Sequence, residues 1–433
     1  MWLHKCGHGP QLAIVSQRSA GIGMCRSFAA HNQSELRSTA MRTIAVFAAT
    51  LLLAFPVLQC KKGAELTAAA NNKFSLALYH TLDNADNLVA SPFSLHAALA
   101  LTYVGARGTT AQQIAKGLHL PQDKGTVKAG YRQTLGVLRG STLLEVATRL
   151  YLQTGAPVLK EFRKAARKAF LADTKELDFA RNTEKARRII NNWVQKRTHS
   201  KISNMIAPGI LNPLTRLVLI NAVYFKAQWL QPFNSDDTKT EPFHVNSTDQ
   251  VEVPMMHIKS YFNFKNAEDL GAKILELPYE GETASMFILL PNELDGLASL
   301  ESSLSARDMT SILQDMQAEE LNVSLPRFKV ESSLDLQSTL ENLGMKDMFN
   351  IEAADFSGIT GSKDIYVSHV LQKAFIEVTE LGTEAGASSA VVAEARSWRP
   401  PPLEYVADHP FVFLIWEKRL NTTLFMGRFS GPQ

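Results

Sequence analysis

The order of its periodic segments constrains the fold of this 433-residue chain more than any other feature. Before about residue 215, apolar residues recur at helical spacing; after it, short runs rich in β-branched and aromatic residues dominate. No internal repeat, low-complexity linker or Gly/Ser-rich hinge separates the two halves. Because the strands need the helices to cover them, we expect one large α+β domain.

The same patterns predict individual elements. The expected helices cover residues 70–83, 93–106, 109–118, 158–171 and 182–199. The expected strands cover 217–225, 251–257, 273–277, 285–290, 322–330, 374–378, 411–417 and 423–429. Residues 87–90 are expected to form a short strand that leads through Ser91-Pro92 into a capped helix, with Ser94 as the capping residue.

Signatures of enzymes and metal sites are missing from the sequence. Its three cysteines all lie within the first 60 residues, so the folded part has no internal disulfide and no reactive thiol. There is no GxSxG elbow, phosphate-binding GxxxxGK[ST] loop, HExxH or paired CxxC. His257, His369 and His409 stand apart from serine or aspartate partners at motif spacing, so we expect hydrogen-bonded structural histidines. We therefore expect no enzyme, no cofactor and no metal.

The first sixty residues differ from the rest. A basic start at Met41-Arg42 precedes the apolar run Ile44–Leu58, as in a secretory signal. We expect 1–40 to be a non-native extension or presequence, 41–60 a signal peptide, and 61–433 the folded domain of a secreted, extracellular protein. The rival interpretation is a mitochondrial presequence, because 1–34 contains arginines and serines but no acidic residue. Three sequons are candidates for glycosylation in a secreted protein: Asn246, Asn322 and Asn421. The alternating run around Asn322 argues that this residue is buried.

Charge is distributed unevenly. Residues 101–200 carry 19 basic and 7 acidic residues, whereas residues 201–433 carry 18 and 31. Five basic residues in the first of these segments share one face of an expected helix: Lys160, Arg163, Lys164, Arg167 and Lys168. One interpretation is an ordinary solvated surface. The other is a binding site for a heparin-like sulfated or phosphorylated polyanion. We expect no nucleic-acid or membrane partner.

The stretch GTEAGASSAVVAEARS, residues 382–397, consists almost entirely of small residues. If it forms a strand, alternate residues share a face. The residues from Thr383 to Ala395 at odd positions are then all uncharged, while Glu384, Glu394 and Arg396 lie on the opposite face. Thirteen extended residues reach roughly 43 Å, enough to cross a globular domain. The residues by themselves fit both an exposed loop and a strand with one buried face.

Many blocks of the chain, in order, resemble the serpin family. They include SPFSLHAALALTYVGARGTTAQQI (91–114), NAVYFKAQWLQPF (221–233), LPRFKVESSLDLQSTLENLGMKDMF (325–349), SHVLQKAFIEVTELGTEA (368–385) and LFMGRFSGP (424–432). The resemblance runs from about residue 70 to the C-terminus. It departs from the family pattern at Leu381, Ala227 and Gly386. It implies a monomeric single domain with three β-sheets, eight to nine helices and an exposed reactive-centre loop at about 380–406.

The resemblance also implies a function. It makes Arg396–Ser397 the scissile bond offered to a protease, and it places a hinge at Glu380, Gly382, Thr383, Glu384, Ala385, Gly386 and Ala387. Trypsin-type proteases hold arginine against a carboxylate in their specificity pocket. The nearby Arg399 is a poor alternative because Pro400 follows it. The expected function is suicide inhibition of an Arg-specific serine protease, in which the loop inserts into the central sheet. The alternative is a non-inhibitory serpin that acts as a carrier or chaperone.

The resemblance further assigns residues to the sheet that must open. Ser91, Ser94, Asn221 and His369 are expected to form a polar cluster beneath it. Trp229 and Lys373 are expected near the top of the opening.

Overall fold

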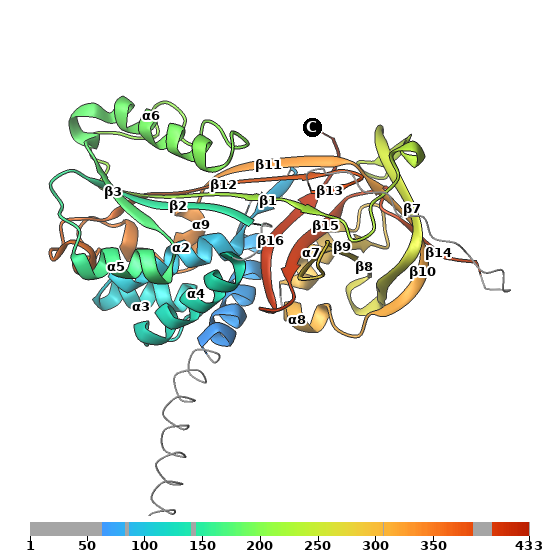
Figure 1. The fold of residues 1–433 in the computed structure, drawn as a ribbon, viewed down its shortest axis with the longest axis horizontal. Coiled ribbons are helices and arrows are strands. Elements are labelled where there is room, and N and C mark those ends of the chain that lie inside the picture. Colours follow the sequence, from blue (N-terminus) through green and yellow to red (C-terminus); the bar gives the residue numbers. More distant parts are fainter. Residues whose placement is uncertain (1–62, 83–85, 140–143, 306, 384–400, 433) are drawn as a thin grey trace, which may run out of the picture. The chain divides into compact units, whose positions relative to one another are not determined.

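A five-stranded sheet lies at the centre of the fold, in the order β11-β12-β4-β2-β3 (Figure 1). The computed structural model describes residues 63–82, 86–139, 144–305, 307–383 and 401–432. The five strands are β2 (Leu144–Gln153), β3 (Asp173–Leu177), β4 (Leu217–Phe225), β11 (Phe328–Asp335) and β12 (Val367–Val378). All nine residues of β4 are buried, which explains its nearly continuous apolar sequence.

Two strands of this sheet that are distant in sequence run parallel as direct neighbours. β12 pairs with β4 from Val367 opposite Leu217 to Phe375 opposite Tyr224. The outer pairs β11/β12 and β2/β4 are antiparallel, and β2/β3 is parallel. Parallel pairing is slightly less stable per residue than antiparallel pairing. A strand inserted between β12 and β4 and running opposite to both would replace this parallel pair with two antiparallel pairs.

The larger sheet has the order β1-β16-β15-β9-β8-β7-β10-β14, with β6 paired to β7. Its strands are β1 (Leu88–Ala90), β6 (Lys239–His244), β7 (Gln250–Ala267), β8 (Ala272–Pro278), β9 (Ala284–Pro291), β10 (Gln317–Pro326), β14 (Leu403–Val406), β15 (Phe411–Glu417) and β16 (Thr422–Phe429). A third sheet consists of β5 (Ala227–Gln228) and β13 (Gly382–Thr383). Together these give the three expected sheets.

Helices cover both faces of the five-stranded sheet. The helices of the described residues are 63–81, α2 (Pro92–Gly105), α3 (Gly108–Gly117), α4 (Lys124–Arg139), α5 (Lys160–Ala169), α6 (Phe179–Arg197), α7 (Leu297–Leu304), α8 (Met309–Ile312), α9 (Gln337–Asn342) and α10 (Ser357–Thr360). Three short 3₁₀ turns are η1 (Ser235–Asp237), η2 (Glu268–Leu270) and η3 (Asp347–Phe349). In Figure 1, α6 lies on one face of the sheet and α2 to α5 on the other. Ile190 and Val194 of α6 form one core cluster with Tyr151 of β2 and Ile220 of β4.

The expected α+β fold with three sheets is confirmed. Setting aside the four-residue turns α8 and α10, eight helices remain among the described residues, within the expected eight to nine. The sequence analysis missed α4, although its buried residues recur at helical spacing. Its glycines lower helix propensity, but Gly130 is required there: a Cβ at this position would lie 2.5 Å from the carbonyl oxygen of Gly63.

The N-cap of α2 lies three residues before the expected position. Ser91, not Ser94, is the N-cap, and its side chain accepts a hydrogen bond from the backbone N–H of Ser94 at 3.4 Å. Pro92 follows in the first turn, where its missing N–H costs nothing.

Candidate functional site: the hinge and the polar cluster

The chain reverses direction immediately after β12, in a turn closed by Thr379 and Gly382. The N–H of each residue donates to the carbonyl of the other, at 2.9 and 3.1 Å. Gly382 has φ +129°, and a Cβ there would lie 2.4 Å from the carbonyl oxygen of Ala227. Glycine alone fits such a conformation against so close a backbone. β13 then runs antiparallel to β5, which follows β4 directly along the chain.

Thr383 is completely buried under an aromatic platform. Its hydroxyl lies 3.1 Å from that of Tyr279, whose ring stacks on Trp229 with centroids 4.6 Å apart. The indole N–H of Trp229 donates to the carbonyl of Thr379 at 3.0 Å. Burial raises the pKa of Tyr279 far above its usual value, so its hydroxyl stays protonated. The platform therefore holds both ends of the turn.

Glu380 anchors the middle of the turn and is only 9% exposed. Its carboxylate accepts a hydrogen bond from the hydroxyl of Thr238 at 2.8 Å and lies 3.6 Å from Nε of Arg327. Its carbonyl oxygen accepts from the backbone N–H of Phe233 at 2.8 Å. The other expected hinge and bait residues lie outside the described residues: Glu384, Ala385, Gly386, Ala387, Arg396 and Ser397.

A buried polar cluster joins α2 to the two parallel strands. Ser94 of α2 donates from its hydroxyl to Oδ1 of Asn221 on β4 at 2.7 Å. Gln372 of β12 donates from Nε2 to the same Oδ1 at 2.7 Å and to the carbonyl of Ser91 at 2.9 Å. Its Oε1 accepts from the N–H of Ser91 at 3.0 Å. Asn221 also donates to the hydroxyl of Thr148 at 2.9 Å. The cluster therefore ties β12, β4 and β2 to the start of α2.

His369, expected in the cluster, and Lys373, expected near the top of the opening, both lie elsewhere. His369 faces the other side of β12, where its Nδ1 lies 3.2 Å from Oδ2 of Asp335, and Gln372 takes the place expected for it. The two residues are three apart in the strand, so they point to opposite faces. Lys373 is adjacent to Gln372, with Nζ 2.9 Å from the carbonyl of Ser203. It lies six residues, about 20 Å of strand, from the turn beside Trp229.

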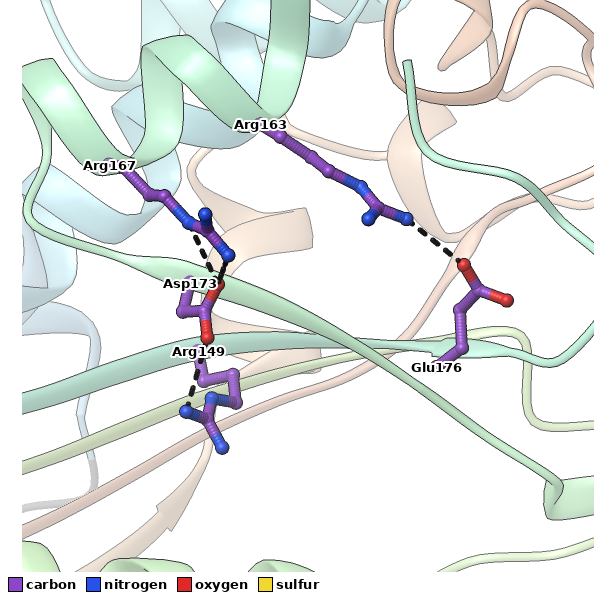
Figure 2. Close-up of polar contacts among 5 residues, drawn as sticks. All are labelled: Arg149, Arg163, Arg167, Asp173 and Glu176. Atoms are coloured by element: carbon purple, nitrogen blue, oxygen red, sulfur yellow. Dashed lines mark hydrogen bonds and ion pairs between the residues drawn. The ribbon is translucent and has the colours of Figure 1, made fainter. Parts of the chain in front are cut away.

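The five basic residues expected on one helix face do lie on α5, but its arginines and two of its lysines have different surroundings. An Arg163 guanidinium nitrogen lies 3.2 Å from Glu176, and one of Arg167 lies 3.2 Å from Asp173, both carboxylates of β3 (Figure 2). Asp173 also pairs with Arg149 of β2 at 3.3 Å. The charge of the two α5 arginines is thus partly compensated.

The lysines of α5 have a different environment. Lys164 and Lys168 line a groove of about 390 Å³ between α5 and α4. Lys128 and Arg132 of α4 line it as well, together with the single carboxylate of Glu161. Small residues complete the lining: Gly125, Ala129, Ala165 and Ala169. Sequence reasoning missed the α4 half of this surface because it missed the helix.

The sequons and the remaining histidines occupy distinct settings. Asn246 is half-buried in the β6–β7 turn, where its Oδ1 accepts from the N–H of Thr248 at 2.8 Å. Asn322 is half-buried on β10, and Asn421 is exposed in the β15–β16 turn. His257 contacts the hydroxyl of Ser324 at 3.0 Å, and His409 contacts the carbonyl of Pro291 at 2.9 Å.

Neither a metal centre nor a membrane segment is present in the described part of the chain. No three metal-ligating side chains converge among residues 63–82, 86–139, 144–305, 307–383 and 401–432. Within the same ranges, each helix is too short or too polar to cross a bilayer.

A central sheet with a parallel β12/β4 junction and a glycine turn beside it defines a class of protein, and comparison with known proteins identifies it. The family model described as Serpin (serine protease inhibitor) matches residues 69–432. Human Serpin B3 is 40% identical over 385 residues, covering 84% of this chain and 98% of its own length. Human leukocyte elastase inhibitor is 39% identical over 383 residues, covering 85% and 100%. The crystal structure of Serpin48 from the insect Tenebrio molitor has a TM-score of 0.78 at 37% identity, covering 84% and 98%. The chain belongs to the serpin family.

One expectation is corrected by this finding. The missing hydrolase motifs led only to the negative statement that the chain is not an enzyme. The family, and a relative named as an inhibitor of an elastase, replace that statement with a positive class: serine protease inhibitors.

Proposed function

We propose that this serpin inhibits a trypsin-like serine protease by offering Arg396–Ser397 for cleavage and then inserting the cleaved loop between β12 and β4. The observation that carries the proposal is the position of the turn at Thr379–Gly382. It lies at the end of β12 and beside the end of β4, and the chain leaves it in the reverse direction. A strand that continues from Thr383 in that direction is antiparallel to both neighbours.

Insertion replaces one parallel pair by two antiparallel pairs, which favours the inserted state. Addition of the reactive loop to the central sheet as a new strand is the known behaviour of inhibitory serpins. The odd-numbered residues from Thr383 to Ala395 are small or uncharged and suit a buried face. Thr383 is already inside the core, so the inserting strand has a buried starting point.

The target class follows from one side chain. A protease that acylates at Arg396 must accommodate a guanidinium group, which trypsin-type enzymes do with a carboxylate at the base of the pocket. A human relative carries the name of an elastase inhibitor, which supports inhibition in general. The arginine in this chain favours an Arg-specific enzyme instead.

The test is incubation with a panel of Arg-specific serine proteases, followed by denaturing electrophoresis. We expect a complex that survives SDS, because the acyl bond is covalent, and we expect Arg396→Ala to abolish it while leaving the folded state unchanged. Cleavage without a complex would support the carrier or chaperone alternative. A complex that forms equally well with Arg396→Ala would place the scissile bond elsewhere.

We also propose a polyanion partner at the α4/α5 groove. Its support is the concentration of Lys128, Arg132, Lys164 and Lys168 around one hollow with a single carboxylate. Salt-titrated elution from a heparin column tests it. Lys164→Gln/Lys168→Gln should elute earlier, whereas Arg163→Gln/Arg167→Gln should change elution less, since those arginines already have carboxylate partners. Equal effects of the two pairs would contradict the groove.

Export is the last part of the proposal. It is supported by the apolar run Ile44–Leu58 after Met41-Arg42, and by the sequon at Asn246 in the β6–β7 turn. Expression of the full chain in cultured cells should give protein in the medium whose mass falls after treatment with an N-glycosidase. Retention of the whole product inside the cells would contradict export.

A further inference from the structure

A groove of about 390 Å³ lies where several segments that are distant in sequence meet. His80 comes from the end of helix 63–81, and Val245 comes from the β6–β7 turn. Pro410 directly precedes β15, and Ser430 directly follows β16. Helix α7 and the residues just before it complete the lining, so we call this hollow the α7 groove. Its volume lies within the range of small-molecule sites in proteins.

Glu301 of α7 lines the groove and is only 7% exposed. Its Oε1 accepts two hydrogen bonds, from the hydroxyl of Tyr79 at 2.6 Å and from Nη1 of Arg428 at 3.2 Å. Burial and the nearby carboxylate raise the pKa of Tyr79 well above its usual value, so this hydroxyl stays protonated and donates. Oε2 of Glu301 receives no hydrogen bond from the described residues, and it is not sealed from solvent. The groove therefore contains a fixed carboxylate with one acceptor oxygen unused.

Asp295 supplies a second carboxylate, which is exposed and lies just before α7. Its Oδ1 accepts from the backbone N–H of Ser247 at 3.0 Å, which holds the side chain beside the β6–β7 turn. No lysine or arginine is found in the lining among the described residues, and His80 is its one other titratable side chain. Arg428 is 1% exposed and already pairs with Glu301. The complementary ligand therefore carries a positive charge.

A metal ion does not suit this lining. No three metal-ligating side chains converge in the described part of the chain, and two carboxylates leave most ligand positions of a hard cation unfilled. The other walls are apolar: Val245 is 36% exposed, Leu294 and Leu297 are half-buried, and Pro410 is buried. A ligand with an apolar body would remove these walls from water, which favours binding. The lining therefore suits an organic cation with an apolar part.

We propose that the α7 groove is a binding site for a small amphipathic amine. Its ammonium group donates to Oε2 of Glu301 and is attracted by the carboxylate of Asp295, while its apolar part covers the apolar walls. Such a ligand binds the folded chain and stabilises it by mass action. The inference does not depend on the proposed function, because none of the groove residues belongs to the turn at Thr379–Gly382 or to the reactive loop.

The test measures binding of two amines, tryptamine and hexylamine, to the full chain by titration calorimetry and by the shift in thermal midpoint. Indole-3-propionate is the matched probe, because it keeps the indole ring of tryptamine and carries a carboxylate in place of the ammonium group. If charge and apolar contact act together, at least one amine should bind saturably and raise the midpoint. Indole-3-propionate should do neither.

Two variants locate the site, each with a control on another surface. Ala298→Trp places a large side chain on the exposed face of α7 that lines the groove, and Ala353→Trp does the same in the exposed turn after η3. Asp295→Asn removes the charge but keeps the acceptor for Ser247, and Asp236→Asn removes an exposed charge in η1. Each variant's midpoint is first measured without ligand.

We expect Ala298→Trp to abolish amine binding and Asp295→Asn to weaken it about threefold, the effect of one exposed charge. The weakening by Asp295→Asn should shrink as salt screens the charge. Both controls, and Arg396→Ala, should bind the amine like the unaltered protein. If Ala298→Trp lowers the midpoint without ligand, Asp295→Asn and its salt dependence still decide the question.

Three results would overturn the inference. The first is the absence of saturable binding of either amine at concentrations up to about 1 mM, a very weak affinity for a small-molecule site. The second is equally tight binding of indole-3-propionate, since the carboxylates of the groove should repel it. The third is amine binding that Asp295→Asn leaves unchanged at low salt, which would place the bound amine elsewhere.

Discussion

Removal of the Gln372 side chain should loosen the junction that loop insertion requires. Gln372→Ala leaves the buried N–H of Ser91 without its acceptor, at a cost of about 1–3 kcal/mol. The carbonyl of Ser91 keeps the backbone N–H of Leu95 at 3.2 Å, and Oδ1 of Asn221 keeps the hydroxyl of Ser94. Gln372→Ala also removes the two hydrogen bonds that Nε2 of Gln372 donates to these oxygens. Because each oxygen keeps another donor, each of these losses costs only about 1 kcal/mol. We expect a total destabilisation of about 3–5 kcal/mol.

The assay is urea unfolding of the intact protein, with Gln317→Ala as the matched control. Gln317 is an exposed residue at the start of β10, so its truncation should change the unfolding free energy by less than about 0.5 kcal/mol. The midpoint of Gln372→Ala should fall while the slope stays the same, because the surface exposed on unfolding is unchanged. A Gln372→Ala midpoint equal to that of the control would refute the claim that this cluster holds β12 to β4 and α2.

Three further outcomes follow from single residues. Gly382→Ala should destabilise the turn by several kcal/mol, because its Cβ would overlap the backbone of Ala227; an unchanged melting temperature would contradict the geometry. Thr383→Arg should convert the inhibitor into a substrate, since a charge buried beside Tyr279 without a partner costs several kcal/mol; full inhibition at unchanged stoichiometry would count against insertion. Burial lowers the pKa of His96 from about 6.5 to about 4. The free energy of unfolding therefore has its full value above pH 6.5 and falls by about 3 kcal/mol as the pH drops from 6.5 through 4. Urea unfolding at pH 7 and pH 4.5 measures this loss, and His96→Gln should lose less over the same range.

The sequence determined the elements whose pattern is local and strong. β4 was expected at 217–225 and forms there, and the helix expected at 93–106 runs from Pro92 to Gly105. Both consist almost entirely of apolar residues with clear boundaries, so both can be predicted without knowledge of distant contacts. The parity of residues 383–395 is a property of the sequence alone, and so is the arginine at 396.

Only the tertiary structure decided which distant groups meet. β3 has the sequence DTKEL, which lacks an apolar pattern and becomes a strand because β2 pairs with it. Its carboxylates at Asp173 and Glu176 then compensate two arginines of α5, which divides a uniform basic stripe into a paired side and a groove. Gln372 rather than His369 enters the polar cluster because the faces of β12 are fixed by its neighbours α2 and β4. Spacing along a chain fixes which residues share a face of an element, but packing against other elements fixes which face is buried and what it touches.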